Sequence, residues 1–157
     1  MVSRSGIGYD IHRLAADRRL VLGGVAIEHP TGLVGHSDGD VLAHALMDAL
    51  LGAANLGDIG RHFPSDDPAY AGARSVELLR RVGALIRERG LGVGSLDATV
   101  IAQAPRLAPH IDAMRVTIAK ALAIGVDRVS VKATTNDGLG IVGSGDAIAA
   151  LAIATVE

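Results

Sequence analysis

In the sequence GHSDGDVLAHALMDALLGA, residues 35–53, a polar, glycine-broken loop leads directly into an apolar run. From residue 41 onward the apolar side chains recur every three or four positions, which is the spacing of one face of an α-helix. We interpret Ser37 and Asp40 as a capping pair at the start of this helix. The predicted buried face consists of Val41, Leu42, Ala45, Leu46, Ala49, Leu50 and Ala53.

Around this helix, glycines and prolines separate further short elements. Two more helices are predicted, one from Ser75 to Arg89 and one that opens at Pro109 and stops near Gly125. Long polar loops are expected at residues 55–72 and 135–145. Strands are predicted at residues 7–11, 96–103, 129–134 and 147–156, with a tight hairpin formed by 20–22 and 25–27.

This order of elements predicts an α/β (α+β) fold, with residues 1–157 forming one domain. We expect a single mixed sheet of four-stranded type with three helices packed on one of its faces. The other face then needs cover, and a homo-oligomer is the simplest cover. Hydrophobic residues make up 49% of the chain, which is consistent with apolar side chains buried between subunits as well as within one.

Composition excludes several classes of protein. The formal net charge of −2 gives no basic excess for nucleic acid or an anionic membrane surface, and three aromatic residues are too few for a base-stacking platform. With no cysteine, neither a disulfide scaffold nor a thiolate metal site is available, so any metal must bind histidine and carboxylate. The sequence has no apolar run of membrane-spanning length, and we expect a cytoplasmic protein.

A candidate metal site comes from two segments. Asp10 and His12 are two residues apart on a predicted strand, so their side chains share a face, and His44 lies on the predicted helix. One carboxylate and two imidazoles suit a catalytic zinc with one open coordination position. Asp40 and Asp48, four residues either side of His44, are placed to orient its ring. The alternative is that each histidine is a surface or packing residue.

Three further segments carry polar residues of interest. His36 and Ser37 lie at the mouth of the helix, where backbone amides attract phosphate, although Ser37 as a simple cap is an alternative. The acidic segment 57–68 has the composition of either a mobile lid over polyol hydroxyls or a solvated turn. Segment 132–140 offers Thr134 and Thr135 for phosphate oxygens and Asp137 for a hard cation, without forming a P-loop.

The run Gln103-Ala-Pro-Arg follows a predicted strand and is either a base- or pyrophosphate-binding turn or a plain connection. Together with four other blocks it resembles one enzyme family, that of the 2-C-methyl-D-erythritol 2,4-cyclodiphosphate synthases. The other blocks are Ile7-Gly-Tyr-Asp-Ile-His-Arg, Gly35-His-Ser-Asp-Gly-Asp-Val-Leu-Ala-His-Ala, Leu56-Gly-Asp-Ile-Gly and Lys132-Ala-Thr-Thr-Asn-Asp-Gly-Leu-Gly. The resemblance covers nearly the whole chain, in matching order and spacing.

The resemblance implies a phosphorus–oxygen lyase of the non-mevalonate isoprenoid route. Such an enzyme converts 4-diphosphocytidyl-2-C-methyl-D-erythritol 2-phosphate into the 2,4-cyclodiphosphate and releases CMP. It further implies one Zn²⁺ per subunit on Asp10, His12 and His44, a second divalent ion (Mg²⁺ or Mn²⁺) on the diphosphate, and His36 and Thr135 as transition-state stabilisers. It also implies a homotrimer with active sites between neighbouring subunits.

By the same resemblance, substrate contacts are expected along several segments of the chain. These expected contacts are Asp10, His12, His36, Ser37, Asp58, Ile59, Gly60, Phe63, Pro64, Ser65, Asp66, Asp67, Ala102, Gln103, Ala104, Pro105, Arg106, Leu107, Ala108, Lys132, Thr134, Thr135, Asn136, Asp137, Ile141 and Ser144. Within this set the resemblance assigns 58–60 to the erythritol hydroxyls, 63–67 to a flexible flap, 102–108 to the cytidine and 134–137 to the diphosphate.

Three positions depart from the family pattern. Asp137 stands where the family usually has glutamate, so its contact with the second metal is expected to become water-mediated. Ser65 replaces an acidic flap residue. Ser144 replaces an arginine that in many members helps to bind isoprenoid diphosphate in a cavity on the trimer axis, so that ligand is not expected here.

Two other functions fit the same residues less well. One is a metal-dependent nucleotide phosphohydrolase, which would release free phosphate from simple nucleotides. The other is a non-catalytic trimer that binds isoprenoid diphosphates, which the intact metal set and the pair His36 and Thr135 disfavour.

Overall fold

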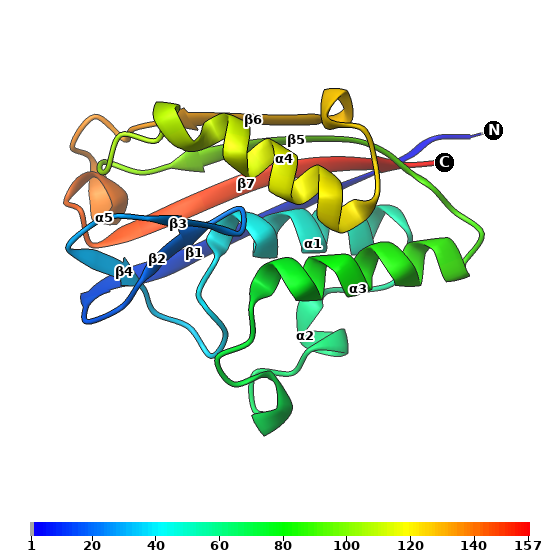
Figure 1. Ribbon diagram of the computed structural model, residues 1–157, viewed down its shortest axis with the longest axis horizontal. Coiled ribbons are helices and arrows are strands. Elements are labelled where there is room, and N and C mark those ends of the chain that lie inside the picture. Colours follow the sequence, from blue (N-terminus) through cyan, green and yellow to red (C-terminus); the bar gives the residue numbers. More distant parts are fainter. Residues whose placement is uncertain (1) are drawn as a thin grey trace.

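The computed structural model describes residues 2–157 and is built on one five-stranded sheet (Figure 1). The strand order is β4-β1-β7-β5-β6. All neighbouring strands are antiparallel except β5 and β6, which are parallel. The strands are β1 (Arg4–Ala16), β4 (Thr31–Leu33), β5 (Val93–Ile101), β6 (Val129–Thr134) and β7 (Ala147–Val156).

The four-stranded sheet predicted from the sequence is therefore wrong by one strand, because the short edge strand β4 pairs with the end of β1. Strand β1 also extends well beyond the predicted 7–11. The predicted hairpin is confirmed as a separate two-stranded sheet of β2 (Leu20–Leu22) and β3 (Val25–Ile27). Gly23 and Gly24 form its turn with φ of 59° and 75°, values that favour glycine.

The three long helices lie on one side of the sheet, as predicted, but in two layers (Figure 1). Helix α1 (Val41–Ala53) packs on β1 and β7, and α4 (Ile111–Leu122) packs on β6. Helix α3 (Ser75–Glu88) packs chiefly on α1 and α4 rather than on the sheet. Because α1 lies between strands and α3, eleven of its residues are buried, and it forms the centre of the core.

The two expected loops contain short helical turns that their polar, glycine-rich sequences did not predict. These turns are α2 (Ile59–His62), α5 (Gly140–Gly143) and the 3₁₀ turn Pro68–Tyr70. Two further 3₁₀ turns, Ala108–His110 and Val126–Arg128, flank α4. No helix among residues 2–157 has the length and apolar character that crossing a membrane requires.

Glycines on β1 determine how closely α1 approaches the sheet. A Cβ atom at Gly6 would lie 2.1 Å from the Ala49 carbonyl oxygen, and one at Gly8 would lie 1.9 Å from that of Ala45. Only glycine fits at both positions. Because alternate residues of a strand share a face, positions 10 and 12 point toward α1 as well. The two glycines thus bring Asp10 and His12 next to the helix that carries His44.

The opposite face of the sheet is apolar and exposed. Ile7 and Tyr9 on β1 are 78% and 56% exposed, and they pair in register with Ile153 and Leu151 of β7, each 51% exposed. A contiguous exposed apolar patch on a sheet is typical of a protein–protein contact.

Candidate metal centre and the pockets beside it

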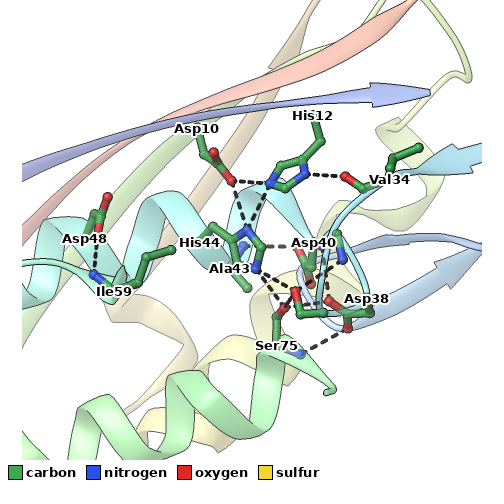
Figure 2. Close-up of polar contacts among 12 residues, drawn as sticks. Asp10, His12, Val34, Asp38, Asp40, Ala43, His44, Asp48, Ile59 and Ser75 are labelled. Atoms are coloured by element: carbon green, nitrogen blue, oxygen red, sulfur yellow. Dashed lines mark hydrogen bonds and ion pairs between the residues drawn. The ribbon is translucent and has the colours of Figure 1, made fainter. Parts of the chain in front are cut away.

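The three predicted metal ligands converge at one point (Figure 2). Asp10 Oδ2 lies 2.8 Å from His12 Nε2 and 2.9 Å from His44 Nδ1, and the two nitrogens are 3.2 Å apart. Asp10 and His12 come from β1 and His44 from α1, so the close packing of that strand and helix creates the site. His44 is 7% exposed, whereas Asp10 and His12 are half-buried.

Hydrogen bonds on the far side of each ring fix which nitrogen faces the centre. His12 Nδ1 lies 2.5 Å from the Val34 carbonyl oxygen, which only accepts, so Nδ1 carries the hydrogen and a neutral His12 presents its Nε2 lone pair inward. His44 Nε2 lies 2.9 Å from Ser75 Oγ, and Ser75 Oγ donates to Asp38, so His44 Nε2 carries the hydrogen. Neutral His44 therefore presents the lone pair of Nδ1 inward.

Three lone-pair atoms that face one another repel unless a cation lies between them. A carboxylate oxygen and two imidazole nitrogens are the ligand types that zinc and similar divalent ions bind, and each imidazole has the supporting hydrogen bond typical of metal ligands. The donor set present therefore fits a divalent metal ion. Three protein ligands leave a coordination position for a substrate oxygen.

The pKa values of Asp10 and His12 are shifted by the contacts within this cluster. Burial raises the pKa of Asp10, but hydrogen bonds from His12 and His44 outweigh it and lower the pKa to about 2. The hydrogen bond to Asp10 raises the pKa of His12 above 6.5, against the opposing effect of burial. A proton and a metal ion thus compete for the same inward-facing atoms.

A cavity of about 190 Å³ opens beside the metal ligands. The predicted site residues that line this cavity are the three candidate metal ligands together with His36, Ser37, Ile59, Phe63 and Ser65. Three apolar lining residues were not predicted, namely Met47, Tyr70 and Leu78. Met47 and Leu78 are core positions of α1 and α3, and the sequence pattern does not distinguish a core side chain that also borders a cavity.

The predicted flap is joined to His36. His36 Nε2 lies 2.9 Å from the Asp67 carbonyl oxygen, and the Gly72 backbone N–H donates to the His36 carbonyl oxygen at 2.8 Å. Phe63 and Tyr70 pack edge to face with ring centroids 5.4 Å apart. The predicted flap, residues 63–67, is therefore held at Phe63 by this aromatic pair and at Asp67 by the contact with His36.

The remaining predicted residues of this loop lie beside the cavity lining rather than in it. Asp58 caps α2 by accepting from the Arg61 backbone N–H at 3.0 Å, and Gly60 lies within α2. Pro64 and Asp66 are in the same loop and do not line the cavity. The side chain of Asp67 caps the following 3₁₀ turn.

The cytidine-side residues predicted from the sequence gather in a different cavity, of about 310 Å³. This second cavity and the metal-side cavity share no lining residue. Gln103 Oε1 accepts from the Gly138 backbone N–H at 3.2 Å, which joins the two loops that form it. The lining consists of Ala102, Gln103, Ala104, Pro105, Arg106, Leu107, Ala108, Ala133, Thr134 and Thr135.

Besides the five residues of the 58–67 loop named above, five predicted substrate contacts at 132–144 lie outside both cavities. Lys132 forms an ion pair with Asp97, and the Asn136 side chain donates to the Leu139 carbonyl oxygen. Asp137 accepts from the Thr135 hydroxyl at 3.3 Å. The other two are Ile141, exposed on α5, and Ser144, whose hydroxyl lies 2.7 Å from Asp146 Oδ2.

Two predictions about the start of α1 are wrong. Asp40, not a Ser37–Asp40 pair, caps the helix, because its Oδ1 accepts from the Ala43 backbone N–H at 3.0 Å. Neither Asp40 nor Asp48 orients the His44 ring. Asp40 also accepts from the hairpin amides of Gly23 and Gly24. Figure 2 shows that Asp48 instead accepts from the Ile59 backbone N–H.

The residues that do contact the outer nitrogen of His44 are Ser37 and Ser75, at 3.1 Å and 2.9 Å. Ser75 and its partner Asp38 were missed by the sequence analysis. Ser75 is the first residue of α3, thirty-one positions after His44, and a serine at the start of a helix is ordinarily a cap.

The fold and the site together define an α/β protein with a carboxylate–imidazole cluster that could hold a metal ion and that opens into a ligand-sized cavity. The family model described as YgbB family matches residues 3–157. A 2-C-methyl-D-erythritol 2,4-cyclodiphosphate synthase from Alkaliphilus oremlandii is 58% identical over 153 residues, which are 98% of this chain and 98% of that protein.

Solved structures agree with the sequence matches. The bifunctional IspDF from Campylobacter jejuni superposes with a TM-score of 0.95 at 42% identity, over 99% of this chain and 42% of that one. IspF from Plasmodium falciparum, solved as a CDP complex, superposes with a TM-score of 0.86 at 34% identity, over 98% of this chain and 95% of that one. The chain belongs to the YgbB family, that of the 2-C-methyl-D-erythritol 2,4-cyclodiphosphate synthases.

Proposed function

We propose that the chain is a phosphorus–oxygen lyase that cyclises 4-diphosphocytidyl-2-C-methyl-D-erythritol 2-phosphate. An oxygen of the 2-phosphate attacks the β-phosphorus and forms a new P–O bond. The bond from the β-phosphorus to the oxygen on the α-phosphorus breaks, and CMP leaves with that oxygen. The other product is 2-C-methyl-D-erythritol 2,4-cyclodiphosphate, an isoprenoid precursor, and we expect the reaction in the cytoplasm.

The observation that carries this proposal is the convergence of three lone-pair atoms beside a cavity lined by His36 and Ser37. Phosphoryl transfer requires mainly that charged groups be positioned and neutralised, with little covalent chemistry by the protein. A divalent ion held by Asp10, His12 and His44, zinc in our proposal, supplies Lewis-acid neutralisation of phosphate oxygens. Family membership supports the particular substrate.

The chain's own residues then bind and orient the two phosphates. His36, exposed at the cavity mouth, donates a hydrogen bond to charge that develops on the attacked phosphate, and Ser37 holds a phosphate oxygen. Residues 58–60 contact the erythritol hydroxyls and 63–67 close over them. For His36 to turn toward phosphate, its contact with the Asp67 carbonyl oxygen has to open, which couples the flap to binding.

The nucleotide is proposed to bind in the second cavity, formed by 102–108 with Thr134 and Thr135. A relative that is 34% identical was solved in complex with CDP, which supports a cytidine site in this fold. We propose Thr135 as the second transition-state stabiliser and a second divalent ion, Mg²⁺ or Mn²⁺, on the diphosphate. Asp137, which is one methylene shorter than the glutamate usual in the family, is proposed to contact that ion through water, and its carboxylate accepts a hydrogen bond from Thr135.

We further propose a homotrimer in which the metal-side cavity of one subunit faces the nucleotide cavity of the next. Two observations support it: the two cavities share no residue, and the sheet face away from the helices exposes large apolar side chains. No isoprenoid diphosphate is expected on the trimer axis, because Ser144 brings no cation and lies against Asp146.

The reaction is tested by incubating the purified protein with this substrate and Mg²⁺, with and without Zn²⁺, and following phosphorus by NMR. Two coupled ring-phosphate signals together with CMP are expected. Unchanged substrate from zinc-loaded protein would contradict the proposal, and so would release of free phosphate from simple nucleotides, which is the result that a phosphohydrolase gives.

A further inference from the structure

His44 receives two hydroxyl contacts on the nitrogen that faces away from the metal site. Ser75 Oγ lies 2.9 Å and Ser37 Oγ 3.1 Å from Nε2, and the two hydroxyl oxygens are 3.3 Å apart. One N–H hydrogen cannot be donated fully to both. Which serine keeps the imidazole oriented, and which remains available to a ligand, is decided by how each hydroxyl is itself held.

Ser75 is held rigidly. It is completely buried at the first position of α3, and its hydroxyl donates to Asp38 Oδ1 at 2.5 Å. Its backbone N–H donates to the other carboxylate oxygen, Oδ2, at 3.0 Å (Figure 2). Because its only hydroxyl hydrogen goes to Asp38, Ser75 can only accept from His44. That arrangement permits one neutral tautomer of His44, the one with its Nδ1 lone pair toward Asp10 and His12.

Ser37 is held loosely. It is half-buried and lines the metal-side cavity, which Ser75 does not. Apart from the two contacts already named, its hydroxyl receives only a long 3.4 Å contact from the Gly39 backbone N–H. A phosphate oxygen in the cavity would offer its hydroxyl hydrogen a stronger, charge-assisted acceptor. Turning toward that acceptor leaves His44 with the Ser75 partner still in place.

We propose that Asp38 and Ser75 are a positioning pair for His44, and that their role is distinct from that of Ser37. The pair fixes the metal-binding tautomer of His44 and thereby releases the Ser37 hydroxyl for the substrate phosphate. The statement about metal binding stands without any particular reaction, whereas the phosphate role of Ser37 rests on the function proposed above.

The test compares Ser75→Ala with its matched control, Ser37→Ala. Zinc affinity is measured on metal-free protein by competition with a chromophoric chelator at fixed pH. Ser75→Ala is expected to bind zinc roughly 10–100-fold more weakly, the range for loss of a group that orients a metal-bound histidine. Ser37→Ala is expected to stay within about threefold of the parent protein. Asp38→Asn, which keeps the shape but removes the charge, is expected to give an intermediate loss.

Substrate kinetics at saturating zinc test the phosphate role of Ser37, and the spectrum of bound Co²⁺ separates the two serines a second time. Ser37→Ala is expected to raise KM because the phosphate loses a hydrogen bond. Ser75→Ala is expected to raise KM as well, because Ser37 is then the only partner of His44 Nε2. In Ser37→Ala protein loaded with Co²⁺, the visible absorption bands are expected to match the parent protein, whereas those of Ser75→Ala shift.

Thermal melting of the metal-free variants shows whether the fold is retained. Ser75→Ala is expected to fold, because alanine is a good helix former. Parent-like zinc affinity in folded Ser75→Ala and Asp38→Asn would overturn the proposal. An equal loss of zinc affinity in Ser37→Ala would overturn it as well. If the zinc pattern is as expected while even the parent protein leaves the substrate unchanged, the positioning pair is supported and the proposed reaction is rejected.

Discussion

The candidate metal side and the side proposed to bind the nucleotide, called the metal side and the nucleotide side below, are built in contrasting ways. On the metal side, His44, Asp40 and Ser75 are buried and hydrogen-bonded to elements far apart in the sequence. On the nucleotide side, Gln103, Thr134 and Thr135 are exposed. Their side-chain hydrogen bonds mostly join close neighbours, and the two segments are linked by Gln103 with Gly138 and by the Ala102 N–H with the Thr134 carbonyl oxygen.

This difference indicates that the two sides are positioned by different means. The buried metal side is positioned by the core of a single chain, so its ligands are held in place before any substrate binds. The nucleotide side consists of loops on an open surface, and such loops need a second surface to enclose a ligand.

Loss of a metal ligand is expected to have the largest effect. His12→Ala should reduce turnover of the proposed substrate by ~10²-fold or more, the scale for removing an electrostatic stabiliser of the transition state. Turnover and zinc content per chain are both measured. His29→Ala, which alters a histidine outside both cavities, is the control and should keep both. Full turnover by His12→Ala protein would show that the metal site takes no part in the reaction.

The close packing of α1 on β1 is tested by Gly8→Ala. The added Cβ would lie 1.9 Å from the Ala45 carbonyl oxygen, so strand and helix must separate. We expect a loss of about 3 kcal/mol in the free energy of unfolding by urea, together with weakened zinc binding. Gly52→Ala is the matched control, because a Cβ there comes no closer than 4.0 Å to another residue. Equal stability of the two variants would contradict this view of the site.

Asp40 tests the buried frame around the start of α1. Its carboxylate accepts from the backbone N–H groups of Gly23, Gly24 and Ala43, at 2.9, 2.7 and 3.0 Å. In Asp40→Asn an amide hydrogen would face one of these donors, and we expect a loss of about 1–3 kcal/mol in unfolding free energy. Asp112→Asn, at a side chain 91% exposed, should change it by less than about 0.5 kcal/mol. If Asp40→Asn left the free energy of unfolding unchanged, these three hydrogen bonds would be dispensable for stability.

The smallest expected effect is a pH dependence of the metal-free protein. The raised pKa of His12 means that its bond with Asp10 stabilises fully below pH 6.5 and is lost as pH rises through the raised value. The lowered pKa of Asp10 means that this stabilisation is present above 3.8 and is lost as pH falls through about 2. Melting temperature should therefore fall slightly from pH 5 to 8 relative to His12→Ala, and zinc should reverse the trend. A parallel pH profile in the two proteins would contradict it.

The sequence predicted the cluster of Asp10, His12 and His44 because its geometry follows from local periodicity. Asp10 and His12 alternate on a strand, and His44 follows the apolar spacing of α1. The long helices and strand β6 were predicted from the same periodicity, the hairpin from its Gly23-Gly24 turn and β7 from its nearly continuous apolar run. The fifth strand, β4, was missed because three residues around a glycine carry no detectable alternation.

The partners of His44 could not be predicted. Ser75 reaches it only because α3 packs against α1, a contact that depends on tertiary structure. Asp40 and Asp48 had helical spacing from His44, yet backbone amides of the hairpin and of α2 bind them instead. Backbone N–H groups of distant segments therefore determine how these two carboxylates are hydrogen-bonded. Sequence spacing alone does not reveal such donors. The roles of the substrate-contact residues stay predictions.

If the metal side of one chain works with the nucleotide side of another, mixing two inactive variants should restore activity. His12→Ala and Thr135→Ala subunits are unfolded, combined in equal amounts and refolded together, and turnover is measured. In random mixed trimers one site of three would combine two intact halves, so about a quarter of the parent activity should return. A mixture no more active than the separate variants would show that each chain forms its own site.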